Sequence, residues 1–179
     1  MTKLRFFMFL TAAALLLGPG LESAFAQGQF QAITGAAFDS AAPNTVTIEG
    51  KNFPVQKRNA AMVQSPSGGR AFLALLDTTG YTTDVAAQKF VGAIVTTGGN
   101  LSVGGRSIGA GTYGFGWAVP PAGDEGPGKF SLYTQAGAKL GEVATQRDAG
   151  LATPRPLQVV VLKNGTAQLY FGRHSVELR

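Results

Sequence analysis

The sequence predicts an all-β fold, a single β-sandwich or partly closed barrel that follows a cleaved N-terminal signal peptide helix. After residue 45, short apolar segments alternate with clusters of Gly, Pro, Asn and Asp at fairly regular spacing. Apolar residues at helical spacing are nearly absent from the same region. The chain also has 25 glycines, roughly twice the usual share, and most stand where turns are expected.

Eight strands are expected, and only residues 83–89 are predicted as a helical turn. The most strongly patterned pair of strands flanks Lys163-Asn164-Gly165, because Asn-Gly tolerates the positive φ angles of a tight hairpin. The first strand of this C-terminal hairpin is almost wholly apolar, so we expect the hairpin at the centre of the domain, covered on both faces. The predicted strands are residues 45–49, 70–76, 90–96, 112–119, 129–133, 157–162, 166–171 and 175–178.

A weak internal repeat relates residues 46–54 to residues 101–109. Both copies run apolar, polar, apolar, and then place a glycine directly before a basic residue. Each copy therefore predicts a strand, a tight glycine turn and a second strand.

The N-terminal segment has the pattern of an export signal. Lys3 and Arg5 precede an apolar run over residues 6–17, and Ala24-Phe25-Ala26 supplies small residues at a cleavage site. The competing interpretation is a retained membrane anchor, but a span needs about 20 apolar residues and Gly18-Pro19-Gly20 interrupts the run. The predicted organisation is a signal peptide (1–26), a loose lead-in (27–44) and a β domain (45–179).

Charge and cysteine content narrow the classes of partner. The formal net charge is +5, and Lys57-Arg58 is the only adjacent basic pair. Nucleic-acid-binding proteins concentrate Lys and Arg on one face or helix, so no nucleic-acid partner is expected. A chain without cysteine has no disulfide and no thiolate metal site. The predictions are a bacterial periplasmic or secreted location, no cofactor, and no stable membrane insertion after cleavage.

Three segments carry a resemblance to a group of exported bacterial β-domain proteins of unknown function. They are residues 105–115, which read GRSIGAGTYGF, residues 155–159 and residues 170–173. In that group a Gly-Lys or Gly-Arg turn precedes a Pro-Ala-Gly-Thr-Tyr segment, whereas this chain has Gly109 at the proline position. The resemblance implies an exported β domain and brings no functional residues.

Two literal motif matches lie side by side. Residues 105–109 fit the Gly-x-Ser-x-Gly nucleophile elbow around Ser107, and Asp148 and His174 follow in the order of an α/β-hydrolase triad. Residues 109–114 fit the dinucleotide pattern G-x-G-x-x-G. Both motifs require a strand that leads into a helix, and a strand is predicted after Gly109. The esterase-like hydrolase is therefore kept as the alternative function.

Residues 112–119 alternate strictly between large and small side chains. Tyr113, Phe115, Trp117 and Val119 are expected on one face of a strand. An exposed aromatic row would stack on sugar rings, but burial of such large rings in the core is the favoured interpretation.

The predicted function is a non-enzymatic binding or structural module of the cell envelope or exterior, with an envelope glycan or peptide as its partner. Loops carry recognition more often than sheets do. The candidate ligand site therefore combines Trp117, placed near the end of its strand, with Asp124 and Glu125 of the 120–128 loop. Adjacent acids could contact calcium, but solvated carboxylates are the simpler interpretation. His174 is the only histidine, so no metal site is expected.

Overall fold

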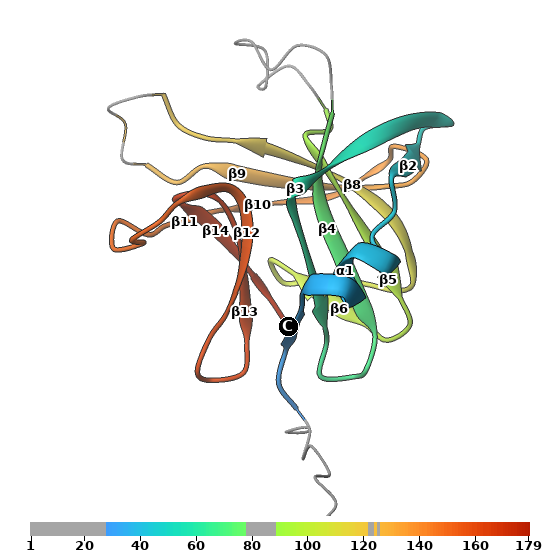
Figure 1. The fold of residues 1–179 in the computed structure, drawn as a ribbon. Helices are drawn as coiled ribbons and strands as arrows, with labels where there is room; N and C mark the ends of the chain where they lie inside the picture. The colour runs from blue at the N-terminus through green and yellow to red at the C-terminus, as the bar shows by residue number, and fades with distance from the viewer. Residues whose placement is uncertain (1–27, 78–88, 122–123, 125) are drawn as a thin grey trace, which may run out of the picture.

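Two antiparallel sheets pack face to face without closing into a barrel (Figure 1), which confirms the predicted all-β sandwich. The structure is a computed structural model that describes residues 28–77, 89–121, 124 and 126–179. The predicted signal peptide lies outside these residues. So does the predicted helical turn at 83–89, apart from Lys89.

The larger sheet, here called sheet I, has the order β1-β3-β4-β5-β8-β9-β10, and β2 pairs with β3 beside this path. All its neighbouring strands are antiparallel. Its strands are β1 (Gln31–Ile33), β2 (Thr45–Ile48), β3 (Lys51–Gln64), β4 (Arg70–Leu76), β5 (Gly92–Thr97), β8 (Gly111–Ala118), β9 (Lys129–Thr134) and β10 (Lys139–Ala144).

The smaller sheet, sheet II, has the order β12-β13-β14-β6-β7, with β11 paired to β14. Its strands are β6 (Leu101–Val103), β7 (Arg106–Ile108), β11 (Gln146–Arg147), β12 (Arg155–Val161), β13 (Ala167–Gly172) and β14 (His174–Leu178). The C-terminal hairpin is confirmed as β12 and β13. Its expected central place is wrong, because β12 is an edge strand of sheet II. Its apolar run is explained by its position alongside β3 of sheet I.

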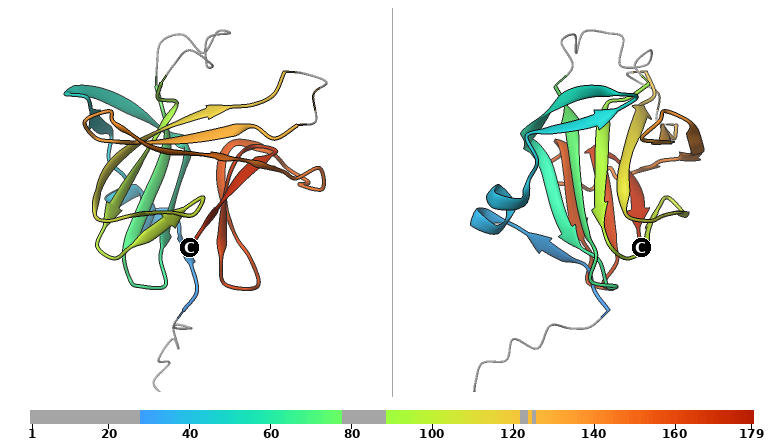
Figure 2. Two further views of the ribbon diagram at one scale, coloured as in Figure 1. Left: turned by 180° about the vertical axis from the view of Figure 1, so that it is seen from behind. Right: turned by 90° about the vertical axis from the view of Figure 1, so that its right-hand side faces the viewer.

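The main core lies between the two sheets, and the outer face of sheet I is buried as well. In β4, Leu73 and Leu75 point into the core between the sheets, whereas Phe72 and Leu76 pack on the opposite face. A short helix, α1 (Gly35–Ala41), and strand β2 cover this outer face (Figure 2). Sheet I is therefore a layer covered on both sides, and its strands can be apolar at every position.

The lead-in expected to be loose contains β1 and α1. Phe30 is only 3% exposed and belongs to the main core, which anchors this segment to the domain. The segment was difficult to predict because β1 has three residues and α1 seven, too short for a clear periodic pattern. The stretch between the predicted strands 129–133 and 157–162, where no strand was expected, likewise contains β10 and β11.

The two copies of the internal repeat form the predicted strand, turn and strand. In the first copy, Glu49-Gly50 joins β2 to β3 with φ angles of 51° and 72°. In the second, Gly104-Gly105 joins β6 to β7 with φ angles of 56° and 80°. Two successive residues at positive φ are typical of the tight turn that suits a twisted hairpin.

Strand β3 changes partners along its length, and this change positions the candidate site. Its first residues pair with β2, and its last residues pair with β1 and β4. Against β4 the register jumps: Val55 is opposite Leu76, and the next pair is Ala60 with Ala74. Four residues of β3 therefore stand against one residue of β4, which makes a large β-bulge. The part of β3 that precedes the bulge, residues 51–55, bends over the outer face of sheet I together with β2 (Figure 2).

Candidate functional site: the bulge pocket of strand β3

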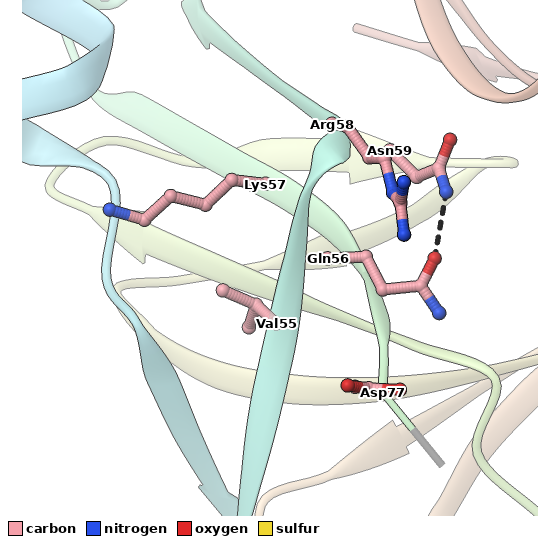
Figure 3. A pocket seen from close by; sticks show the side chains of 6 residues that line it. All are labelled: Val55, Gln56, Lys57, Arg58, Asn59 and Asp77. Atoms are coloured by element: carbon pink, nitrogen blue, oxygen red, sulfur yellow. Dashed lines mark hydrogen bonds between the residues drawn. The ribbon is translucent and has the colours of Figure 1, made fainter. Parts of the chain in front are cut away.

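The β-bulge opens a solvent-facing hollow, which we call the bulge pocket (Figure 3). Its volume is about 450 Å³, within the range of sites that bind small molecules. The pocket is formed almost entirely by polar side chains, and the bulge supplies most of them. The lining residues are Val55, Gln56, Lys57, Arg58, Asn59 and Asp77.

Two amides at the ends of the bulge hold each other in place. Asn59 Nδ2 donates a hydrogen bond of 2.7 Å to Gln56 Oε1, and Gln56 Nε2 donates one of 3.1 Å to the carbonyl of Leu76. Both side chains are part-buried. An amide offers two donors and one acceptor oxygen. The Asn59 oxygen and one N–H of each amide therefore remain for a ligand.

Three charged side chains surround these amides. Lys57, Arg58 and Asp77 are exposed. Among the described residues, none of the three forms an ion pair or a side-chain hydrogen bond. Arg58 lies on the same side as the two amides, whereas Lys57 points away from them (Figure 3). The pocket thus presents a guanidinium and a carboxylate that have no partner among the described residues, beside two amides that hydrogen bonds hold in place.

The local sequence explains why the bulge forms here. The local run Gln56-Lys57-Arg58-Asn59 consists of four consecutive polar residues between two apolar segments of β3. Sheet I is buried on both faces, so a regular register would place some of these side chains in an apolar layer. The bulge lifts them out of the ladder. In the sequence, Lys57-Arg58 stands out only as an adjacent basic pair; the signal for the bulge is the longer polar run of residues 56–59 inside a strand.

The first residue of the predicted ligand site, Trp117, lies in the core. Its side chain is 2% exposed and packs against Phe130, Phe171 and Phe115, with ring centroids 5.1, 5.6 and 6.4 Å away. Its Nε1 has no hydrogen-bond partner in the part of the chain that the structure describes. The indole is therefore closed to a stacking ligand, which corrects the proposed site and supports the core interpretation of the aromatic row.

The two acids of the predicted site give it no further support. Asp124 is exposed, and its Oδ1 accepts a 2.8 Å hydrogen bond from the backbone N–H of Gly126, so it stabilises its own turn. Glu125 lies outside the described residues. Across the part of the chain that is described, no three His, Asp or Glu side chains gather as a metal site.

The residues of the alternative hydrolase triad lie apart. Ser107 is in β7, two strands from β14. His174 is the first residue of β14. The last residue of that strand, Leu178, is the one that pairs with β6. Four residues of strand span about 13 Å. His174 is thus far along its strand from the Ser107 end of sheet II, and β7 leads into β8 rather than into a helix.

Asp148 and His174 are also engaged with other residues. Asp148 Oδ2 accepts a 3.0 Å hydrogen bond from the hydroxyl of Tyr170. His174 Nδ1 is hydrogen-bonded to Thr145 Oγ1 at 3.1 Å. Burial lowers the pKa of His174, and the positive charge of Arg147 lowers it further. The structure therefore does not bring the three residues together.

Comparisons with known proteins add no assignment. The chain matches no protein-family model, no curated protein and no solved structure. Among the described residues, no helix is both long and apolar enough to cross a membrane. The function is therefore inferred from the geometry of the bulge pocket.

Proposed function

We propose that the chain is an exported bacterial protein that acts as a non-enzymatic binding module of the cell envelope or exterior and holds a small polar ligand in the bulge pocket. The observation that carries this proposal is the insertion in β3. It gathers Gln56, Arg58, Asn59 and Asp77 around one hollow of about 450 Å³. The pattern of the first 26 residues supports export.

The position of the bulge favours a functional role. Bulges are frequent next to functional sites, where they redirect side chains out of a sheet. Exposed charged groups without partners contribute little to the stability of a fold, so Arg58 and Asp77 have no evident structural task. The described residues that line the pocket include no serine, threonine or histidine, which favours binding over catalysis.

An NMR titration of the ¹⁵N-labelled protein with short peptides and with small oligosaccharides tests the proposal. We expect amide shifts centred on residues 55–59 and Asp77 for at least one of these ligands. Arg58→Ala should weaken that binding about tenfold, because a hydrogen bond to a charged group is lost. Lys51→Ala, on the same strand outside the pocket, is the matched control and should bind normally. If no ligand of the panel shifts the amide signals of the pocket residues, or if Arg58→Ala binds as tightly as the unmodified protein, the proposal is contradicted.

Export has its own test. Expression of the full chain in a Gram-negative bacterium, followed by fractionation and mass spectrometry, should give a mature protein that begins at Gln27. Intact protein in the cytoplasm would contradict export without affecting the binding proposal.

A further inference from the structure

We propose that the ligand of the bulge pocket is zwitterionic: a short peptide or a free amino acid that carries both a carboxylate and an ammonium group. This inference rests on the proposed binding function and names its ligand class. It follows from the arrangement of Arg58, Asp77 and the amides of Gln56 and Asn59.

Two of the charged residues in the pocket, Arg58 and Asp77, have opposite sign and do not pair with each other. Arg58 and Asp77 line the same hollow, yet no ion pair joins them. A ligand with a single charge would satisfy one group and leave the other unmatched. A ligand with separated charges satisfies both: its carboxylate binds the guanidinium, which matches carboxylate geometry, and its ammonium binds Asp77.

The amides of the pocket match the polar groups of a peptide bond. After the bond between Asn59 and Gln56, the Asn59 oxygen can accept and the amide nitrogens can still donate. A peptide bond offers one donor and one acceptor. Because the two side chains are already fixed by hydrogen bonds, little conformational entropy is lost when they bind a ligand.

The remaining lining disfavours a neutral sugar. Carbohydrate-type ligands gain much of their affinity from aromatic faces, and none of the described residues that line the pocket is aromatic. Val55, the one apolar residue among the described lining residues, is partly buried and suits a small side chain such as a methyl group. Lys57 points away from the amides (Figure 3), so Arg58 is the cation assigned to the ligand carboxylate.

Isothermal titration calorimetry with five probes tests the inference: tri-alanine, N-acetyl-tri-alanine, tri-alanine amide, alanine and tri-N-acetylglucosamine. We expect tri-alanine to bind and each blocked end to weaken binding about tenfold, because one charge-assisted hydrogen bond is lost. In Arg58→Ala, amidation of the peptide should have no further effect. In Asp77→Asn, acetylation should have no further effect. Alanine against tri-alanine distinguishes a free amino acid from a peptide as the source.

The outcomes separate this inference from the proposed function. If the doubly charged and blocked peptides bind equally, or if the sugar trimer binds more tightly through the same pocket residues, the proposal of a zwitterionic ligand is wrong. The proposed binding function is then still supported. If none of the five probes binds, the zwitterion is again wrong. Because Arg58 and Asp77 are exposed, both variants should fold. Unchanged Trp117 emission checks this, and Lys51→Ala is the control for loss of one positive charge.

Discussion

Glu49 and Lys89 stand 40 positions apart and join the β2–β3 turn to the outer face of sheet I through a 2.5 Å hydrogen bond from Lys89 Nζ to Glu49 Oε1. The same ammonium lies 5.2 and 5.4 Å from the ring centroids of Phe90 and Tyr133. Among the described residues, Glu49 is the only non-glycine residue at positive φ, at 51°. Glu49 thus combines an unfavourable backbone conformation with an ion pair that holds the β2–β3 hairpin against sheet I. We call this ion pair the clamp.

We predict that Lys89→Met and Glu49→Gln each lower the free energy of unfolding by about 1 kcal/mol or less. An exposed ion pair contributes 0.2–1 kcal/mol and an exposed cation–π contact about 0.5–1 kcal/mol, and both side chains are more than a third exposed. Urea denaturation of the two variants and of the double variant gives their coupling. Lys51→Met is the control from the same hairpin. Additive effects of the two changes would show that the clamp contributes nothing.

Glycines in the sheet are predicted to differ sharply in their tolerance of alanine. A Cβ at Gly92 would lie 2.0 Å from Phe115 Cζ, and one at Gly114 would lie 2.5 Å from Phe90 Cδ1. Overpacking of this kind costs about 1–3 kcal/mol. Gly109 has open space around its Cβ position, so Gly109→Ala should be neutral. Thermal unfolding of the three variants checks this, and equal melting temperatures would contradict it.

Most of the sandwich could be predicted because its strands obey local rules. The run of residues 157–171 has an Asn-Gly turn between two apolar segments, and it forms the expected hairpin. A strand is central only when a second strand pairs with its other side, and β14 pairs with β13 rather than with β12. The local pattern of residues 157–171 does not determine that choice. The central place expected for β12 was wrong for this reason.

The candidate site was harder to predict than the fold. The bulge depends on the register of β3 against β4, a relation between residues about 20 positions apart such as Val55 and Leu76. Trp117 illustrates the opposite case, because the alternation of residues 112–119 favours burial of the large side chains, and Phe115 and Trp117 do lie in the core, although Val119 is exposed. The predicted ligand site placed Trp117 near the end of its strand beside a loop, whereas Phe171 of sheet II packs on the indole.

Trp117 is the only tryptophan, and we predict that its fluorescence emission is blue-shifted and resistant to acrylamide, because its side chain is 2% exposed. Trp117→Ala should cost about 3–5 kcal/mol. Trp117→Phe should cost clearly less, since it keeps an aromatic ring among Phe115, Phe130 and Phe171 and removes an unpaired buried N–H. Emission typical of water-exposed indole, or equal losses in both variants, would contradict the core assignment.

The last prediction concerns pH, and His174 makes it specific because it is the only histidine in the chain. Its folded-state pKa is lowered from 6.5, mainly by burial and further by Arg147. The unfolded chain therefore takes up a proton near pH 6.5, before the folded chain does, and stability falls as the pH is lowered through and below this value. Above pH 6.5 this contribution is fully present.

Urea denaturation between pH 5 and 8 measures this effect directly. The unmodified protein should lose unfolding free energy as the pH falls from 7.5 to 5.5, and His174→Gln should show a flatter profile over the same window. Arg147→Gln removes the second cause, so it should reduce the slope without abolishing it. A protein that becomes more stable on acidification through pH 6.5, or a His174→Gln variant with an unchanged slope, would show that His174 is not held in its neutral form by burial beside Thr145.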